Sequence, residues 1–559
     1  MKLFHTTTFA LCVFFIISFS LPLRSQQSDS LVIPFASPFD FPLLLSGNFG
    51  ELRANHFHGG LDFKTQGASG KTVRALADGY ISRIRVTSGS GYVLHVTYRD
   101  GAYTTINRHL SAFLSPIAER VEAKQYADER WEVDIKPEPN EYPVRAGQPI
   151  ALSGNTGYSF GPHLHLDLLN KDGEYIDPMP FFRPHLTDTR APEARGFRIY
   201  PQTGRGVVNR SGEPQDFSFA VRKPIEVWGE IGMAVKAYDH MNQTNNRYGV
   251  HTVILMVDGR EVCRSVVDKF SDAENRLINA WTEDDYMKSY MEPGNSLRML
   301  RPVDDEYRGI VDIREEREYL FQYTLIDYFG NTSRYRFVVH GRKQPIPVDL
   351  VAPKYRFRWN EVNRLQEPGL DLLIPRAQLY NDVSLQYSTW ADTSSLSFTY
   401  RLHTKRVPLH GGADIQIGLL RKPVADTTKY YVARVSNNGR YSYMGGSYEN
   451  GFVRARITEL GTYTVALDTV APVITPQQPA RWSQTGRVAF KITEKESGIR
   501  SYRGTIDGKY VIFAQHIMTD VLDCRLDAKR IERGKVHELV LTVTDGCGNE
   551  SVWQGTFRW

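Results

Sequence analysis

Short runs of alternating apolar and polar residues recur along most of the chain, with glycine and aspartate between them. In the first third, residues 80–86, 92–98, 103–106 and 163–169 are rich in β-branched and aromatic side chains. Alternation with a period of two is typical of strands that bury one face. The pattern therefore predicts an all-β protein that begins with an antiparallel β domain over residues 30–186.

Beyond residue 185, a repeated motif divides the chain into three further modules. Asp188, Asp349 and Asp468 each begin an Asp-x-x-Ala-Pro sequence that is followed by alternating apolar residues. The first and last modules also share a closing motif, Asp-x-x-Gly-Asn-x-Ser, which begins at Asp327 and Asp545. Gly-Asn between strands is typical of turns. We predict β-sandwich modules, which resemble immunoglobulin-like domains, over residues 188–346, 349–467 and 468–559.

Length and composition are ordinary for a chain of several globular domains. The sequence has 559 residues, of which 41% are hydrophobic and 23% are charged, and such a length predicts about four domains. The net charge of +5 is spread along the chain, so a nucleic-acid partner is not expected. Because the first module boundary implies a complete core before it, a chain ending near Leu186 is expected to fold by itself.

The first residues have the pattern of an export signal. Lys2 precedes an apolar run over residues 9–21, which is followed by Ser20-Leu-Pro-Leu-Arg-Ser25, as in secretory signal peptides. The run is shorter than the ~20 residues that cross a membrane, although an uncleaved anchor is the alternative. We predict a signal peptide over residues 1–25 and export to the periplasm, the cell envelope or the extracellular space.

The remaining cysteines and several turn aspartates each have two interpretations. A disulfide between Cys524 and Cys547 within the last module would leave Cys263 unpaired, and three buried thiols are the alternative. The turn aspartates are either calcium ligands or caps of their own turns, and capping is favoured. These aspartates are Asp239, Asp327 and Asp545.

Histidines are concentrated in the first domain, where six of the fifteen lie between residues 56 and 165. His58-Gly-Gly-Leu-Asp62 contains two glycines that let the chain bend. On a straight strand, His58 and Asp62 would lie about 13 Å apart. His163-Leu-His165 alternates instead, so both histidines face one side of a strand with their backbones about 6.6 Å apart.

These residue types are the ligands that a catalytic zinc ion takes. Such a zinc has three ligands from His, Asp, Glu or Cys and keeps a fourth position for water. Two nitrogens on one zinc are only about 3 Å apart, so one of the paired histidines ligates and the other contacts the water. We predict one Zn²⁺ per chain on His58, Asp62 and His165, with His163 at the water. Two further histidines are expected to be structural or to support the ligands, namely His56 and His95.

Three ordered motifs carry a resemblance to a known family. They are His58-x-x-x-Asp62, Arg-His109-Leu and Gly-Asn-Thr-Gly-x-x-x-Gly-Pro-His163-Leu-His165. Over roughly residues 40–180, the sequence resembles the lysostaphin or LytM family of zinc endopeptidases, which cut peptide cross-links in bacterial cell walls. The resemblance implies zinc on the three ligands above and makes His109 and His163 the catalytic histidines beside the water.

The implied activity is that of an exported zinc metalloendopeptidase that hydrolyses peptidoglycan stem peptides or cross-bridges. Peptidoglycan is then the expected partner, and the sandwich modules would hold the enzyme at the wall or against another envelope protein. The alternative is a non-catalytic relative that binds the wall or activates a separate hydrolase. Such proteins usually lack a ligand, whereas all are present here. A third interpretation, an adhesin with an incidental β head, leaves the histidine clustering unexplained.

The segment between Leu110 and Gly147 is longer than the corresponding link in most members of that family. It combines charged residues with Trp131 and four prolines. Long loops in compact domains often shape a binding cleft, so we expect this segment to form a wall of the groove, with Trp131 against the substrate. A solvated surface loop is the alternative.

Overall fold

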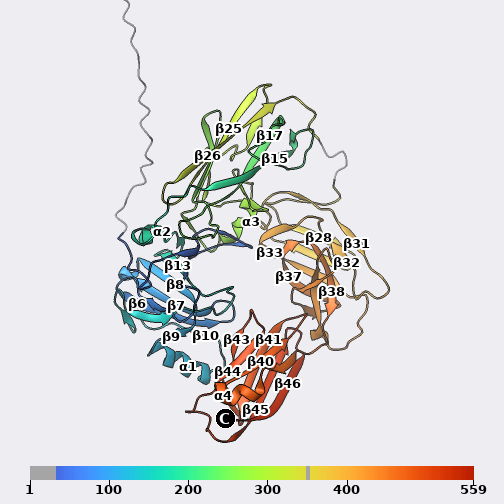
Figure 1. Cartoon of the computed structure of the whole chain (residues 1–559). Helices are drawn as coiled ribbons and strands as arrows, with labels where there is room; N and C mark the ends of the chain where they lie inside the picture. The colour runs from blue at the N-terminus through green and yellow to red at the C-terminus, as the bar shows by residue number, and fades with distance from the viewer. Residues whose placement is uncertain (1–32, 348–352) are drawn as a thin grey trace, which may run out of the picture.

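Strands make up nearly all the regular structure in the computed structural model of this protein (Figure 1), which confirms the all-β prediction. The structure describes residues 33–347 and 353–559. The predicted signal peptide, residues 1–25, and Asp349 lie outside the described residues. Within those two ranges, no helix is both long enough and apolar enough to cross a membrane.

The first domain is built on a 10-stranded sheet whose central path runs β1-β4-β13-β8-β7-β6-β10. Each neighbouring pair along this path is antiparallel. The strands predicted in the first third of the chain are all present. Their bounds are β1 (Leu45–Gly47), β4 (Gly60–Lys64), β6 (Gly79–Thr87), β7 (Gly91–Tyr98), β8 (Tyr103–Leu110), β10 (Val133–Ile135) and β13 (His163–Asn170).

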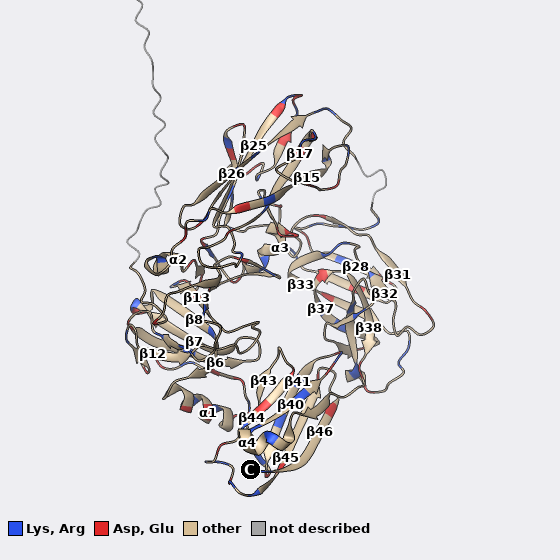
Figure 2. Ribbon diagram, viewed as in Figure 1, with Lys and Arg blue, Asp and Glu red and all other residues tan. Residues whose placement is uncertain are grey.

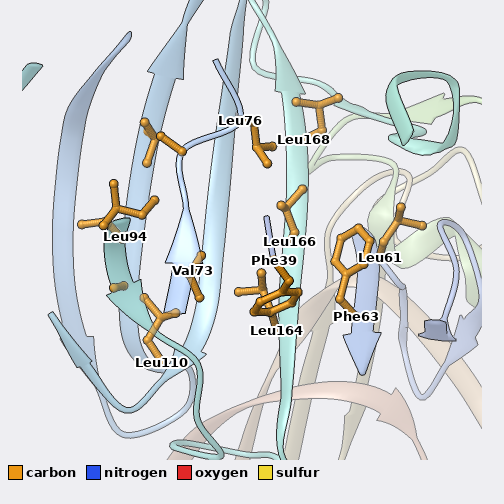
Figure 3. Close-up of a cluster of buried hydrophobic side chains, with 14 of the residues drawn as sticks. Phe39, Leu61, Phe63, Val73, Leu76, Leu94, Leu110, Leu164, Leu166 and Leu168 are labelled. Carbon is orange, nitrogen blue, oxygen red and sulfur yellow. The ribbon is translucent and has the colours of Figure 1, made fainter. Parts of the chain in front are cut away.

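The side chains of β13 divide between the two faces of this sheet. Its alternate leucines, from Leu164 to Leu168, lie in the core beside Leu61 and Phe63 of β4 (Figure 3). Each fully buried side chain of this size stabilises the fold by about 1.5–3 kcal/mol. The residues between the leucines, beginning with His163, face the opposite side of the strand.

A glycine is required where β4 approaches β13. A β carbon at Gly60 would lie 1.9 Å from the carbonyl oxygen of Leu166, so a larger residue would push the two strands apart. The close pairing sets Asp62 directly opposite His165. His58 precedes β4 and follows β3 (His56–Phe57), so the chain turns between His58 and Asp62 as the two glycines predict.

The segment between Leu110 and Gly147 does not form a wall of the groove, and that prediction is wrong. It contains α1 (Ile117–Ala127) and β10, and Trp131 is only 4% exposed within the first core. Gln125 Nε2 donates to the Trp131 carbonyl oxygen at 2.5 Å. Among the described residues that line the groove, none comes from this segment. The charged residues around Trp131 are typical of an exposed segment, but the segment's own helix, α1, covers the tryptophan.

Most strands of the second domain form one 11-stranded sheet, whose main path runs β16-β15-β17-β26-β25-β18-β19-β23. Strand β17 pairs antiparallel with β15 and parallel with β26, so it joins the two halves of the sheet. The bounds are β15 (Glu193–Val208), β16 (Gln215–Phe217), β17 (Glu226–Tyr238), β18 (Thr252–Val257), β19 (Arg260–Val266), β23 (Leu300–Pro302), β25 (Glu318–Ile326) and β26 (Thr332–Gly341).

The third and last domains are each built on two larger sheets around one core. The third has β28 (Asn363–Glu367), β29 (Leu370–Ile374), β33 (Val407–Gly418), β37 (Phe452–Leu460) and β36 (Ser447–Glu449), with β31 (Ser388–Trp390), β32 (Thr399–Arg401), β38 (Thr462–Leu467), β34 (Tyr430–Val435) and β35 (Tyr441–Tyr443). The last has β39 (Val473–Pro476), β40 (Arg487–Thr493), β44 (Val521–Arg525) and β43 (Ala514–His516), with β42 (Lys509–Val511), β41 (Ile499–Ile506), β45 (Val536–Asp545) and β46 (Glu550–Arg558).

The first and second domains exchange core side chains. Phe49 and Phe57 of the first domain lie in the second core, with ring centroids 5.3 Å and 5.2 Å from Phe270. In return, Met241 and Tyr248 of the second domain lie in the first core. The inference that the first core is complete without the later domains is therefore wrong, because a chain ending near residue 186 would expose both phenylalanines.

The four domains follow one another around a ring, so that the last domain returns to the first beside α1 (Figure 1). Glu129, just after α1, accepts hydrogen bonds from Arg503 of the last domain at 3.0 and 2.6 Å. The Arg530 guanidinium lies 3.4 Å from the centre of the Tyr126 ring. Both signs of charge are spread over all four domains (Figure 2).

The three cysteines of the described ranges are buried and free. The disulfide between Cys524 and Cys547 is therefore absent from the structure, and the interpretation as buried thiols is confirmed. Cys547 packs with Tyr431 and Ala466 of the third domain, so it contributes to the contact between the third and last domains.

Candidate metal centre

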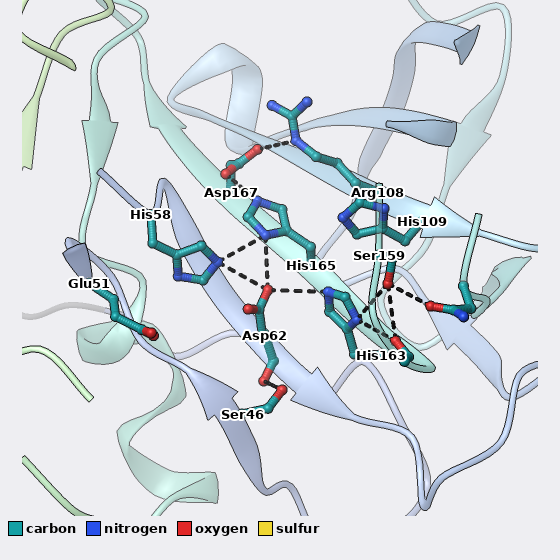
Figure 4. A network of polar contacts seen from close by, with 12 residues as sticks. Ser46, Glu51, His58, Asp62, Arg108, His109, Ser159, His163, His165 and Asp167 are labelled. Carbon is teal, nitrogen blue, oxygen red and sulfur yellow. Dashed lines mark hydrogen bonds and ion pairs between the residues drawn. The ribbon is translucent and has the colours of Figure 1, made fainter. Parts of the chain in front are cut away.

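Three side chains converge on one point beside β4 and β13 (Figure 4). His58 Nε2 lies 3.0 Å from Asp62 Oδ1 and 3.0 Å from His165 Nδ1. His165 Nδ1 lies 2.9 Å from Asp62 Oδ1. Spacings near 3 Å are expected of ligand atoms on one zinc, whose bonds are about 2.0–2.1 Å long. The local fold explains the meeting, since Asp62 and His165 are cross-strand partners.

A second set of contacts orients the two imidazole rings. His58 Nδ1 donates to the Asn48 carbonyl oxygen at 2.6 Å, and His165 Nε2 donates to Asp167 Oδ1 at 2.6 Å. The other Asp167 oxygen accepts from Arg108 Nε at 2.7 Å. Holding the outer nitrogen of each ring turns its inner nitrogen towards the shared centre, as acceptors around metal-bound histidines do.

The charges of this cluster depend on one another. Burial opposes ionisation of Asp62, but His58 and His165 hold the pKa of that carboxyl well below its usual range. Burial also disfavours a charge on His165, yet Asp167 and Asp62 raise the pKa of that ring to about 9. Without a metal, His165 therefore carries a proton at the centre, which a bound cation would displace.

His109 and His163 lie beside the cluster, with ring centroids 4.9 Å apart. His109 Nδ1 donates to the Thr156 carbonyl oxygen at 2.8 Å, and His163 Nδ1 donates to that of Gly161 at 2.8 Å. Burial lowers the pKa of His109 to about 4 and also lowers the pKa of His163. Both rings are therefore neutral near pH 7 and keep Nε2 as a proton acceptor. His163 Nε2 lies 3.5 Å from Asp62 Oδ1.

The cluster lies in a groove of about 1050 Å³. Two aromatic side chains on its rim are unusually exposed, Tyr158 at 61% and Phe160 at 83%. Their rings meet edge to face with centroids 5.4 Å apart. Both belong to the Gly-Asn-Thr-Gly-x-x-x-Gly segment, so the exposed aromatic surface comes from this motif and not from Trp131. Asn275 of the second domain also lines the groove.

The structure thus brings together all five residues to which the sequence assigned a role, namely His58, Asp62, His109, His163 and His165. Sequence reasoning missed their supports. Asp167 could have been found, because it continues the alternation of His163 and His165 and must share their face. Asn48 accepts the His58 hydrogen bond through its backbone carbonyl oxygen. Every residue has such an oxygen, so the sequence could not identify this support. Of the two remaining histidines, His56 lines the groove, and His95 lies on β7.

Comparison with known proteins gives this region relatives. One is the glycyl-glycine endopeptidase ALE-1 of Staphylococcus capitis, 31% identical over 147 residues, which are 26% of this chain and 32% of that protein. The first domain is of the lysostaphin/LytM type. An uncharacterized metalloprotease of Haemophilus influenzae is 34% identical to the chain over 123 residues, or 22% of this chain and 20% of that protein. The chain therefore spans a third or less of these relatives.

The LytM-type domain also resembles a solved structure, the catalytic domain of the antimicrobial peptidase lysostaphin from Staphylococcus simulans. That match has 26% identity and a TM-score of 0.18, and it covers 24% of this chain and 89% of that chain. Elsewhere, the family model for Zu5-like domains matches residues 354–468, within the third domain. The immunoglobulin-like character of the modules stays a prediction.

Proposed function

We propose that this protein is a zinc-dependent endopeptidase that cleaves peptide bonds in peptidoglycan. The observation that carries the proposal is the meeting of His58, Asp62 and His165 at 2.9–3.0 Å, with two neutral histidines beside them. The similarity to a glycyl-glycine endopeptidase supports the substrate class.

The donor set fits zinc better than it fits a hard cation. Two imidazole nitrogens and one carboxylate oxygen are typical of catalytic zinc sites, whereas calcium and magnesium take oxygen ligands. The contacts from Asn48 and Asp167 to the outer ring nitrogens are also those expected around zinc-bound histidines. When bound, zinc would polarise a carbonyl group and lower the pKa of a water molecule.

His163 and His109 would then together act as general base and general acid in the reaction. Each donates its Nδ1 hydrogen to a backbone carbonyl oxygen, so each has Nε2 free to take a proton from the attacking water. The protonated ring can afterwards hydrogen-bond the developing oxyanion or return the proton to the leaving amine. With centroids 4.9 Å apart, the two rings are close enough to act on one scissile peptide.

The groove suits an extended peptide next to this machinery. Tyr158 and Phe160 present apolar faces to solvent at its rim, where aromatic side chains can pack on a peptide or sugar. We further propose that the protein is exported. The domains after residue 186 would hold the enzyme at the wall or against an envelope protein.

Incubating the zinc-loaded full chain with purified peptidoglycan, and identifying the released fragments by mass spectrometry, tests the proposal. The wild type is expected to release peptide fragments with new amino termini. His163→Ala should keep its zinc and lower kcat by about 10² to 10⁴-fold, the usual contribution of general acid-base catalysis. A fully zinc-loaded wild type that binds peptidoglycan and releases nothing would support the non-catalytic alternative instead.

A further inference from the structure

The two repeated motifs meet in the second domain and form a buried acidic cluster. Asn331 Nδ2 donates to the Asp188 carbonyl oxygen at 3.3 Å and to Asp327 Oδ2 at 2.7 Å, which joins the start of the module to its end. A third carboxylate, Asp239, follows β17. Carboxylate oxygens of Asp188, Asp239 and Asp327 all lie within 4.8 Å of one another.

Two oxygens of this cluster lack a partner. The two residues are only 7% and 6% exposed. Their oxygens Asp188 Oδ2 and Asp239 Oδ1 are buried, yet they accept no hydrogen bond from any described residue. No ion pair with Lys or Arg within the described ranges reaches the three carboxylates, since Arg190 acts on Asp239 only at longer range. An unpaired buried carboxylate is costly, so the cluster calls for a positive charge.

The last domain contains the same arrangement without this deficit. Asp468, Glu494 and Asp545 converge there, and Asn549 links the two motifs as Asn331 does. Ser497 Oγ donates to Asp468 Oδ2 at 2.6 Å. Among the described residues, this cluster has no buried oxygen that lacks a partner.

One position explains the difference between the two clusters at the first aspartate of each. Ser497 lies three residues after Glu494, and the corresponding residue after Asp239 is Asn242. Asn242 donates to Asp188 Oδ1 through its backbone N–H at 3.1 Å, while its side chain hydrogen-bonds Thr189. Asp188 Oδ2 therefore accepts no hydrogen bond within the described part of the chain. The cluster of the second domain is thus a candidate site, and the cluster of the last domain is its control.

We propose that Asp188, Asp239 and Asp327 bind one calcium ion. Carboxylate oxygens without nitrogen or sulfur donors select a hard cation. Three protein carboxylates in one place favour calcium over magnesium, which usually keeps several waters and takes one or two carboxylates. Turn capping, which the sequence favoured, accounts for Asp327 and Asp545 through their bonds to Asn331 and Asn549. It does not account for the two unpartnered oxygens.

The bound ion would fix one end of a loop that reaches the LytM-type domain. Asp239 and Tyr248 exchange two backbone hydrogen bonds of 2.9 and 3.0 Å. Tyr248 Oη donates to the Leu45 carbonyl oxygen at 2.8 Å, and Gly249 is paired with the Asn48 side chain. Asn48 is also the residue whose carbonyl oxygen holds His58. Calcium at the acidic cluster would therefore rigidify the support of the candidate zinc centre.

Calorimetric titration of the zinc-loaded full chain with CaCl₂ tests the proposal without reference to activity. We expect one Ca²⁺ per chain, with a Kd between roughly 10⁻⁴ and 10⁻³ M as in extracellular calcium modules, and a Tm that rises with calcium concentration. Asp239→Asn should abolish this uptake. Glu494→Gln, the matched change in the last domain, and His58→Ala in the zinc centre should both retain it.

Two results would overturn the assignment. One is a wild type that takes up no calcium at about 10 mM, above the expected Kd range. A higher Tm in Asp239→Asn would then show that shared protons neutralise the cluster. The other is uptake that survives Asp239→Asn and disappears in Glu494→Gln, which would put the ion in the last domain. If Asp239→Asn does not fold, Asp188→Asn and the calcium dependence of the wild-type Tm decide between the same outcomes.

Discussion

The LytM-type domain contacts its neighbours at two junctions of opposite character. At the junction with the second domain, Phe49 and Phe57 leave their own domain and are buried against Phe270. At the junction with the last domain, the main contacts are the exposed pair of Glu129 with Arg503 and the stacking of Arg530. Three side chains of the last domain also pack there while only partly buried, namely Tyr502, Ile512 and Ala514.

The difference shows which neighbour belongs to the candidate active site. His58 immediately follows Phe57, and its Nδ1 donates to the Asn48 carbonyl oxygen. The Asn48 side chain in turn makes two hydrogen bonds with the backbone of Gly249 in the second domain. Buried apolar area stabilises at about 25 cal/mol per Å², whereas an exposed ion pair contributes at most about 1 kcal/mol. The second domain therefore helps to build the candidate metal centre, and the last domain mainly closes the ring.

Phe57→Ala should give the largest effect, because it empties a site in the second core. A loss of about 3–5 kcal/mol in the free energy of unfolding is expected, together with weaker zinc binding through the neighbouring His58. Denaturant unfolding and zinc titration measure both. Phe57→Leu fills most of the volume and should lose less than about 1.5 kcal/mol. A loss below about 1 kcal/mol in Phe57→Ala, far under the usual cost of such a cavity, would mean that the shared core is not what joins the two domains.

Asn48→Ala removes both hydrogen bonds to Gly249 and loosens the segment that holds His58. Changes just outside a metal's ligands usually weaken its binding by about 10 to 100-fold, and we expect zinc affinity to fall in that range. Competition with a chromogenic chelator provides the measurement. Asn246→Ala serves as the control, because it removes a contact from the same loop to Ser46 and leaves the Asn48 contacts intact. Equal zinc affinity in both variants would contradict a role for Asn48.

Arg503→Ala should have the smallest effect. Breaking its exposed pair with Glu129 is expected to change the free energy of unfolding by at most about 1 kcal/mol, and zinc content and fragment release should stay at wild-type values. A double-mutant cycle with Glu129→Ala isolates the coupling between the two side chains. A coupling above about 2 kcal/mol, beyond the range of exposed pairs, or a loss of zinc, would make the two junctions equivalent and remove the contrast.

The sequence predicted those features that depend on local pattern. The alternation of His163, His165 and the leucines between them placed both histidines on one face of a strand, and Gly59–Gly60 predicted the bend that brings His58 to Asp62. Both follow from the geometry of a single segment. His58, Asp62, His163 and His165 could be found for this reason, whereas the role of His109 came from the resemblance of its motif to that of a known family.

The features that the sequence did not predict depend on distant partners. Phe57 is indistinguishable in sequence from a residue of its own core, and only the fold shows that it packs against Phe270. Trp131 stands among charged residues, yet α1 and β10 cover it. The repeated motifs drew attention to Asp188 and Asp327 in the sequence. Asp239 lies beside them because it follows β17, which pairs with β15.

Zinc content per chain, measured by mass spectrometry on the full-length wild type and two variants, tests the central claim most directly. The wild type should hold one zinc, His165→Ala close to none, and His163→Ala one, because the first change removes a ligand and the second removes only a neighbouring proton acceptor. Full zinc occupancy in His165→Ala, or its loss in His163→Ala alone, would contradict the assignment of ligands and catalytic histidines.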